Sequence, residues 1–287
     1  MAQDSPAIMA EDQKQEIAGR YFLPRNLEEA ARMQNQHEWL KGGAGGLVLA
    51  PIDLGRQGMR VLDSATADGY WIQDVKSIFP ESTQFVGFDN IPEGYPPLDP
   101  PLEIVKQNLV DEFPSEWGNN FDFVHQRFVI PLFGENEVQP VLRKLIKCMK
   151  PGAWIQLVEM DFKTPVSEPL EACLAAQKFH ELTSSVVSDP LASTKLAARL
   201  NEEGLADVGY KTVDMIAGSS HPDPALGERG RRNMSSVMAY FQSVSSAEKM
   251  GMTEQEWASL PNKFEDEMSK YKIAVRVYFV WGRKPVV

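Results

Sequence analysis

The chain has 287 residues, 43% of them hydrophobic, which is enough to bury one large core but hardly two independent domains. Its formal net charge of -11 would repel a phosphate backbone, so nucleic acid is not expected as a partner. The two cysteines, Cys148 and Cys173, lie too far apart in sequence for a metal or redox pair and favour a reducing compartment.

The N-terminal segment is acidic and polar and does not have the pattern of a secretory signal. The apolar runs fall short of the roughly 20 residues that a membrane helix needs. We therefore expect a soluble, cytoplasmic protein with no membrane partner. Residues 11–20 and Asn26–Lys41 carry helical patterns, and in the second of these a stripe that includes Leu27, Ala31 and His37 should face the main domain.

From residue 59 onward, strand and helix signals alternate, which is typical of a parallel sheet with crossover helices. The expected strands are short and apolar, as burial on both faces of a sheet requires. We place strands at residues 60–64, 84–88, 103–107, 122–126 and 153–159, and helices at residues 69–78 and 138–149.

The second half of the chain departs from this alternation. Helices are expected at Ser167–Ser185 and Ser193–Glu203, a strand at Tyr210–Met215, and a last strand at Lys272–Gly282. Between these two strands lies a largely helical insertion at about 218–271. We expect a helical cap at residues 1–58 and one domain at 59–287 that contains the insertion.

The segment Asp63–Gly69 is the most informative part of the sequence. A strand ends there in a loop of small residues that opens a helix, so the backbone can approach a ligand and present free N–H groups to a carboxylate. An ordinary strand-to-helix turn would look similar. A second apolar strand ends at Asp89 about twenty positions on, where a carboxylate can accept hydrogen bonds from ribose hydroxyls. Together the two features favour a nucleotide-like ligand.

The order of these segments resembles that of class I methyltransferases dependent on S-adenosylmethionine (SAM), from residue 59 to 287. The pattern of that family at the first loop is acidic-x-Gly-x-Gly-x-Gly, and here Ala65 and Ala67 stand at the first two glycine positions. The resemblance implies an α/β, Rossmann-like, seven-stranded sheet with an antiparallel last strand, which NAD dehydrogenases lack. It also implies these SAM contacts: Asp63, Ser64, Ala65 and Gly69 for the methionine part, and Asp89 with Asn90 for the ribose.

Further contacts follow from the same resemblance. Asn108 and Leu109 match the pair that holds the adenine, although Asn replaces the usual acidic residue and could simply start a turn. Gln126 and Arg127, at the end of the fourth strand, would line the cofactor and the substrate.

The N-terminal runs Tyr21–Asn26 and Arg32–Lys41 resemble the cap of fungal secondary-metabolite methyltransferases related to the gliotoxin N-methyltransferase and to regulator-like methyltransferases. In that setting Tyr21, Gln36 and His37 would close over the cofactor. The alternative for His37 is a helix histidine whose hydrogen bonds are satisfied within the fold.

We expect SAM-dependent methyl transfer to an oxygen of a small secondary metabolite, with an aromatic alkaloid as the candidate class. His37 is the first candidate for a general base, and His125, His180 and His221 are further ones. Residues of the insertion and its edge could form an apolar substrate pocket or their own core: Met215, Met234, Met238, Tyr240, Phe241 and Trp257.

Three alternatives stay open: an N-methyltransferase, a non-catalytic regulator with the same fold, and an NAD-dependent oxidoreductase. No metal-ligand spacing stands out, so no metal is expected. The oligomeric state is not indicated.

Overall fold

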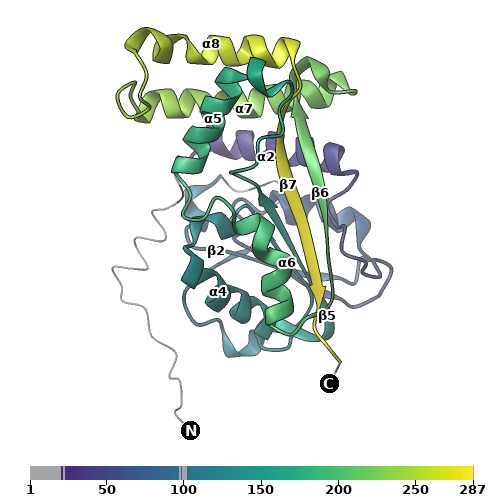
Figure 1. The fold of residues 1–287 in the computed structure, drawn as a ribbon. Helices are drawn as coiled ribbons and strands as arrows, with labels where there is room; N and C mark the ends of the chain where they lie inside the picture. The colour runs from purple at the N-terminus through teal and green to yellow at the C-terminus, as the bar shows by residue number, and fades with distance from the viewer. Residues whose placement is uncertain (1–20, 22, 97, 99–101, 287) are drawn as a thin grey trace.

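The computed structural model describes residue 21 and residues 23–96, 98 and 102–286; the helical pattern at residues 11–20 lies outside this range. Its centre is a seven-stranded sheet with the strand order β3-β2-β1-β4-β5-β7-β6 (Figure 1). The strands are β1 (Arg60–Ser64), β2 (Gln84–Asp89), β3 (Ile104–Lys106), β4 (Phe121–Arg127), β5 (Met149–Met160), β6 (Ala206–Ala217) and β7 (Ile273–Arg283).

Strands β1 to β5 run parallel to one another, and β7 runs antiparallel to both β5 and β6. The predicted antiparallel last strand is therefore confirmed. Strands β5 and β6 are longer than predicted, with 12 residues each, whereas β7 has the predicted length of 11 residues. Strands β6 and β7 reach the helical layer at one end of the sheet (Figure 1). All of the strands expected from the sequence are present.

Helices cover both faces of the sheet. They are α2 (Leu27–Ala44), α3 (Tyr70–Val75), α4 (Glu135–Cys148), α5 (Leu174–Ser185), α6 (Ala192–Glu202), α7 (Pro224–Val244) and α8 (Glu254–Lys270). Helices α4 and α6 pack on one face through a core that includes Leu62, Leu142 and Leu196. On the other face, α3 packs on β1 and β4 through a core that includes Trp71, Val61 and Phe123. Helices α2, α5, α7 and α8 share a third core with β6 and β7, which includes Trp39 and Phe264. Among the described residues, no helix combines the length and the apolar character needed to cross a bilayer.

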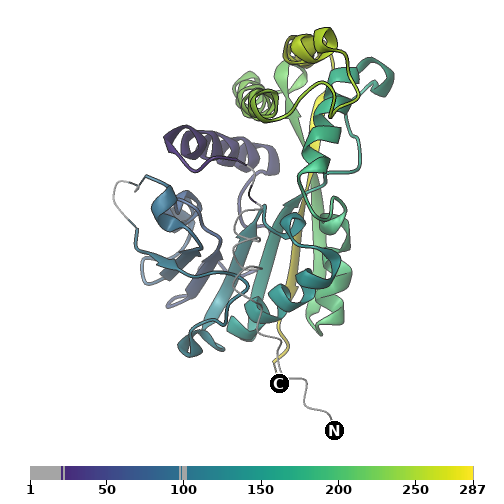
Figure 2. The same ribbon diagram turned by 90° about the vertical axis from the view of Figure 1, so that its left-hand side faces the viewer.

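Helix α2 links the helical layer to the sheet (Figure 2). Asn26 caps it, with Oδ1 accepting from the Glu29 N–H at 2.9 Å, as the sequence predicted. The predicted stripe is partly wrong: His37 is buried, but Leu27 is 71% exposed and Ala31 is exposed. The reason is that α2 packs against α7 as well as the sheet domain, so two partners decide which residues it buries.

Helix α5 also differs from its prediction. It begins at Leu174 rather than at residue 167, because the segment before it contains Pro169 and a 3-10 turn at Leu170–Ala172. The insertion is helical as expected, since α7 and α8 fill most of residues 218–271.

Candidate functional site

A cavity of about 240 Å³ lies at the carboxyl ends of strands β1 to β5. This is the edge where ligands bind in open α/β sheets. Helices α2, α5 and α7 contribute the opposite wall. The lining includes these residues predicted from the sequence: Tyr21, Gln36, Asp63, Ala65, Asp89, Asn90, Asn108, Leu109 and Arg127. The structure thus brings together most of the predicted cofactor residues.

The loop after β1 is held by side chains from its own strand and its neighbour. Asp63 is buried, and its two oxygens are bonded to His125 Nδ1 at 2.7 Å and to the Thr66 hydroxyl at 2.5 Å. His125 also stacks on Trp71, with ring centroids 3.8 Å apart. Asp63 therefore fixes the loop from below, and Ala65, Thr66 and Ala67 present their backbone to the cavity.

Asp89 closes the other side of that loop. Its Oδ2 accepts from the Ala67 N–H and its Oδ1 from the Ile91 N–H, both at 3.0 Å. Burial raises the pKa of this carboxyl, and the backbone donors act in the opposite direction. A carboxylate has about four acceptor positions. Asp89 can thus brace the loop and still accept hydrogen bonds from a diol.

The residues after β2 and β3 extend the lining in the same direction. Asn90, Asn108 and Leu109 border the cavity next to Asp89. Asn108 does start a turn, since its Oδ1 accepts from the Val110 N–H at 3.2 Å. Its amide group still borders the cavity, so the adenine contact stays a prediction.

The N-terminal segment and α2 form a roof over the cavity. The Tyr21 hydroxyl donates to Glu29 at 2.6 Å. Arg32 bonds to both Glu29 oxygens and, through Nη1, to Asn233 Oδ1 of α7 at 2.6 Å. Gln36 lies on the same side of α2 and borders the cavity. The roof is therefore tied to the insertion by buried, charge-assisted hydrogen bonds.

Three predicted cofactor residues lie outside the lining. Ser64 and Gln126 are fully buried and bond to each other, with the Ser64 hydroxyl donating to Gln126 Oε1 at 3.0 Å. Their side chains join β1 to β4 beneath the site because alternate residues of a strand point to opposite faces. Gly69 precedes α3 with a φ of 81° and shapes the turn rather than the cavity wall.

His37 also departs from its expected place. It is fully buried and does not border the cavity. Its Nε2 bonds to Asp74 Oδ2 at 2.8 Å, and its Nδ1 lies 3.2 Å from Arg127 Nη1. Burial and then the charge of Arg127 lower the pKa of His37 to about 3. Both ring nitrogens are engaged, so this geometry favours a role in positioning Arg127 over proton transfer to a substrate.

Two polar residues that the sequence reading left out or ranked low lie at the substrate side. Asp161, the first residue after β5, is buried and borders the cavity. His180 of α5 is partly buried and also borders it. Asp161 Oδ2 and His180 Nε2 are buried without a hydrogen-bond partner among the described residues. The signal that found Asp89, an acidic residue at the end of a strand, also applies to Asp161, which follows the last residue of β5.

Most of the apolar insertion residues form the helical core instead of the pocket. Met215, Met238, Phe241 and Trp257 are buried in the core shared by α2, α5, α7 and α8. Met234 is the member of the predicted set that borders the cavity. The remaining apolar lining at this side includes Phe162, Phe179 and Val237.

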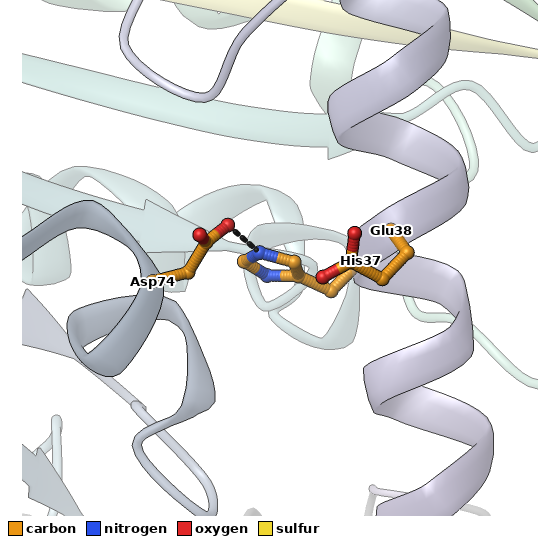
Figure 3. Close-up of side chains that lie close together, drawn as sticks. All are labelled: His37, Glu38 and Asp74. Atoms are coloured by element: carbon orange, nitrogen blue, oxygen red, sulfur yellow. Dashed lines mark hydrogen bonds and ion pairs between the residues drawn. The ribbon is translucent and has the colours of Figure 1, made fainter. Parts of the chain in front are cut away.

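Within the described residues, His37, Glu38 and Asp74 form a cluster whose ligand atoms lie within 4.8 Å of one another (Figure 3). The sequence alone did not indicate this cluster, because Asp74 lies on α3 whereas His37 and Glu38 lie on α2. Lys41 Nζ bonds to both Asp74 oxygens at 2.7 Å, and the Tyr70 hydroxyl donates to Glu38. Because a lysine already neutralises the carboxylate, the donor set does not fit a metal ion.

The cavity fits a nucleoside joined to an amino acid. Asp89 offers acceptors for a diol, and the exposed backbone of the loop leaves room for a ligand against the sheet edge. Arg127 and the carboxylates of Asp63 and Asp68 place charges of both signs at the other end. SAM has this composition, with an adenosine at one end and a zwitterion at the other.

Comparison with known proteins agrees with this geometry. No family model matches the sequence. The N-methyltransferase verN of Clonostachys rogersoniana is 39% identical over 268 residues, which cover 92% of this chain and 93% of verN. The N-methyltransferase gliN of Aspergillus fumigatus is 30% identical over 273 residues, covering 92% of this chain and 96% of gliN.

A solved structure of a methyltransferase from an antibiotic biosynthesis pathway of Anabaena variabilis shares the fold, with a TM-score of 0.52 and 11% identity over 78% of this chain and 91% of that one. The chain belongs to the SAM-dependent methyltransferases of fungal secondary metabolism.

Proposed function

We propose that this protein transfers the methyl group of SAM to a nitrogen atom of a small secondary metabolite. The observation that carries the proposal is the cavity at the strand ends, bordered by the Asp63 loop and by Asp89. The relatives verN, gliN and sirN are named N-methyltransferases, which favours nitrogen over the oxygen acceptor that the sequence reading preferred. The alkaloid class and the cytoplasmic location stay predictions.

When bound, SAM supplies an activated methyl group, so the protein contributes mainly orientation and desolvation. The loop at Ala65–Ala67 and Asp89 would hold the nucleoside against the sheet. Phe162, Phe179 and Met234 would exclude water from the acceptor. The unpartnered Asp161 Oδ2 would accept a hydrogen bond or a proton from the acceptor N–H, and His180 Nε2 would do so in the tautomer that carries its proton on Nδ1.

The direct test incubates the protein with SAM and a panel of secondary metabolites that carry N–H or O–H groups. Mass spectrometry identifies the methylated product, and NMR of that product locates the new methyl on nitrogen or oxygen. A product methylated on oxygen would overturn the choice of acceptor. Calorimetry with SAM, S-adenosylhomocysteine and NAD separates the other candidate functions. Binding of NAD would support an oxidoreductase, and binding of none of the three would support a non-catalytic regulator.

A variant at the ribose side tests the cofactor site. Asp89→Ala should weaken the binding of S-adenosylhomocysteine by about 1–3 kcal/mol, because two hydroxyls would lose their acceptor. The matched control is Glu93→Ala, four residues after the end of β2, where the exposed carboxylate pairs with Lys106 away from the cavity. Calorimetry should show unchanged affinity for the control. Equal affinity in Asp89→Ala would remove Asp89 from ribose recognition.

A further inference from the structure

Arg127, at the carboxyl end of β4, borders the cavity, and no carboxylate among the described residues bonds directly to its guanidinium. Within the described part of the chain it makes no ion pair, and its one side-chain hydrogen bond joins Nη1 to His37 Nδ1 at 3.2 Å. Burial lowers the pKa of Arg127, yet a guanidinium stays protonated in proteins. Arg127 is partly buried, and the carboxylates of Asp63, Asp68 and Glu159 act on its charge from beyond ion-pair distance, so its remaining N–H donors have no directly bonded anion. The guanidinium therefore has donors available for an anion that enters the cavity.

His37, the hydrogen-bond partner of Arg127, is held in one tautomer by its neighbours. His37 Nε2 lies 2.8 Å from Asp74 Oδ2, and Lys41 Nζ lies 2.7 Å from each Asp74 oxygen (Figure 3 shows the His37–Asp74 contact). A carboxylate can only accept, so Nε2 carries the proton and Nδ1 offers its lone pair to Arg127. Lys41, Asp74 and His37 thus form a chain of hydrogen bonds that ends at the guanidinium of Arg127.

The strand order tells which end of a bound ligand meets Arg127. Asp89 ends β2 and Asn108 comes shortly after β3, on one side of β1, whereas Arg127 ends β4, on the other side. A nucleoside over β2 and β3 directs its amino-acid portion toward β4. The acceptors Asp63 and Asp68 border the same end and suit an ammonium group. The complementary group is a carboxylate, whose planar shape matches the fork of an arginine.

We propose that Arg127 binds the carboxylate of the amino-acid portion of the cofactor, and that His37, fixed by Asp74 and Lys41, is a positioning residue that orients Arg127. The inference rests on the proposed function. A substrate carboxylate is the other possible source of the same chemistry, and the experiment separates the two.

Calorimetry with two nucleosides isolates the carboxylate contact. S-Adenosylhomocysteine carries the amino-acid portion, and 5′-methylthioadenosine lacks it. Arg127→Gln should weaken the binding of S-adenosylhomocysteine by about tenfold to a hundredfold, the scale of a lost charge-assisted hydrogen bond, and leave 5′-methylthioadenosine unaffected. The control is Arg231→Gln on α7, whose guanidinium pairs with Glu228 and Glu265 outside the cavity. Its affinity for both nucleosides should match the unmodified protein.

Each other result overturns the carboxylate assignment. Unchanged affinity for S-adenosylhomocysteine, combined with a raised KM for the acceptor, would assign Arg127 to a substrate carboxylate. Equal weakening of both nucleosides would show a general structural role. If the unmodified protein binds neither nucleoside, the proposed function itself fails, and that result is distinct from a failure confined to Arg127→Gln.

Two conservative variants test the positioning role of His37. The side-chain oxygen of Asn can take the place of Nδ1, whereas the amide nitrogen of Gln takes that of Nε2. His37→Asn should therefore keep the acceptor for Arg127 and retain affinity for S-adenosylhomocysteine within about threefold, and His37→Gln should lose about tenfold. Neither should change the affinity for 5′-methylthioadenosine. Equal effects in the two variants would remove His37 from the positioning of Arg127.

Discussion

At the scale of single residues, the loop after β1 has alanine at two positions where the methyltransferase family pattern has glycine. Ala65 and Ala67 have φ values of 54° and 53°, in the left-handed region that glycine enters without steric cost. A residue with a Cβ pays roughly 1–2 kcal/mol there. The sequence motif thus identified the loop correctly, and the structure shows that its shape is kept in spite of the substitutions.

This strain makes a testable prediction at Ala67, which is partly exposed. Ala67→Gly should raise the free energy of unfolding by up to about 1 kcal/mol, since the relief of strain exceeds the extra entropy of the unfolded chain. The control is Ala239→Gly, at an exposed position within α7, which should lower that free energy by about 1 kcal/mol. Urea denaturation measures both. A destabilised Ala67→Gly would show that the loop is not strained.

At the scale of elements, the contact between α2 and α7 decides the shape of the cavity. Gly230 of α7 packs against the ring of Trp39 on α2, and an added Cβ would lie 2.7 Å from Trp39 Cε2 and 2.9 Å from the backbone of Ala217. The helices can approach closely because position 230 has no side chain. The next turn of α7 carries Asn233 and Met234, which border the cavity.

Gly230→Ala should therefore destabilise the protein by about 1–3 kcal/mol, although alanine is the better helix former. It should also weaken the binding of S-adenosylhomocysteine, because Asn233 would move away from Arg32. Ser236→Ala, at an exposed position of the same helix, should change stability by less than about 0.5 kcal/mol. Chemical denaturation and calorimetry test the pair. A more stable Gly230→Ala would mean that the two helices can separate at no cost.

At the scale of the whole molecule, three buried groups couple stability to pH. Burial lowers the pKa of His37 from 6.5 to about 3 and also lowers the pKa of His125, so the unfolded chain takes up more protons as the pH falls. Burial raises the pKa of Glu159 to about 8, so there the folded chain holds the extra proton. Stability is lost on acidification through the histidines and on alkalinisation through the glutamate.

The contribution of His37 can be isolated with His37→Asn. Above about pH 7 the difference in unfolding free energy between the variant and the unmodified protein should be constant. As the pH falls from 6.5 toward 3, the variant should gain relative stability by up to about 1.4 kcal/mol per pH unit, because it has no imidazole to protonate on unfolding. Denaturation curves at several pH values measure this slope. A flat difference would mean that folding does not lower the pKa of His37.

The sequence by itself determined the alternation of strands and helices, the antiparallel last strand and the residues at the strand ends, such as Asp63, Asp89 and Arg127. The alternation follows from local patterns of burial, and the strand-end positions follow from the rule that parallel strands end at one edge. The antiparallel direction of the last strand was implied by the resemblance to the methyltransferase family.

Only the tertiary structure decided the partners of those residues. Asp63 meets His125 across 62 positions, and His37 meets Asp74 across 37, because packing of separate elements brings them together. Ser64 and Gln126 point away from the cavity because alternate residues of a strand face opposite sides of the sheet. His37, the expected base, is buried instead and bonds to Asp74 and Arg127. Such contacts depend on how helices dock on the sheet, which no local pattern of residues records.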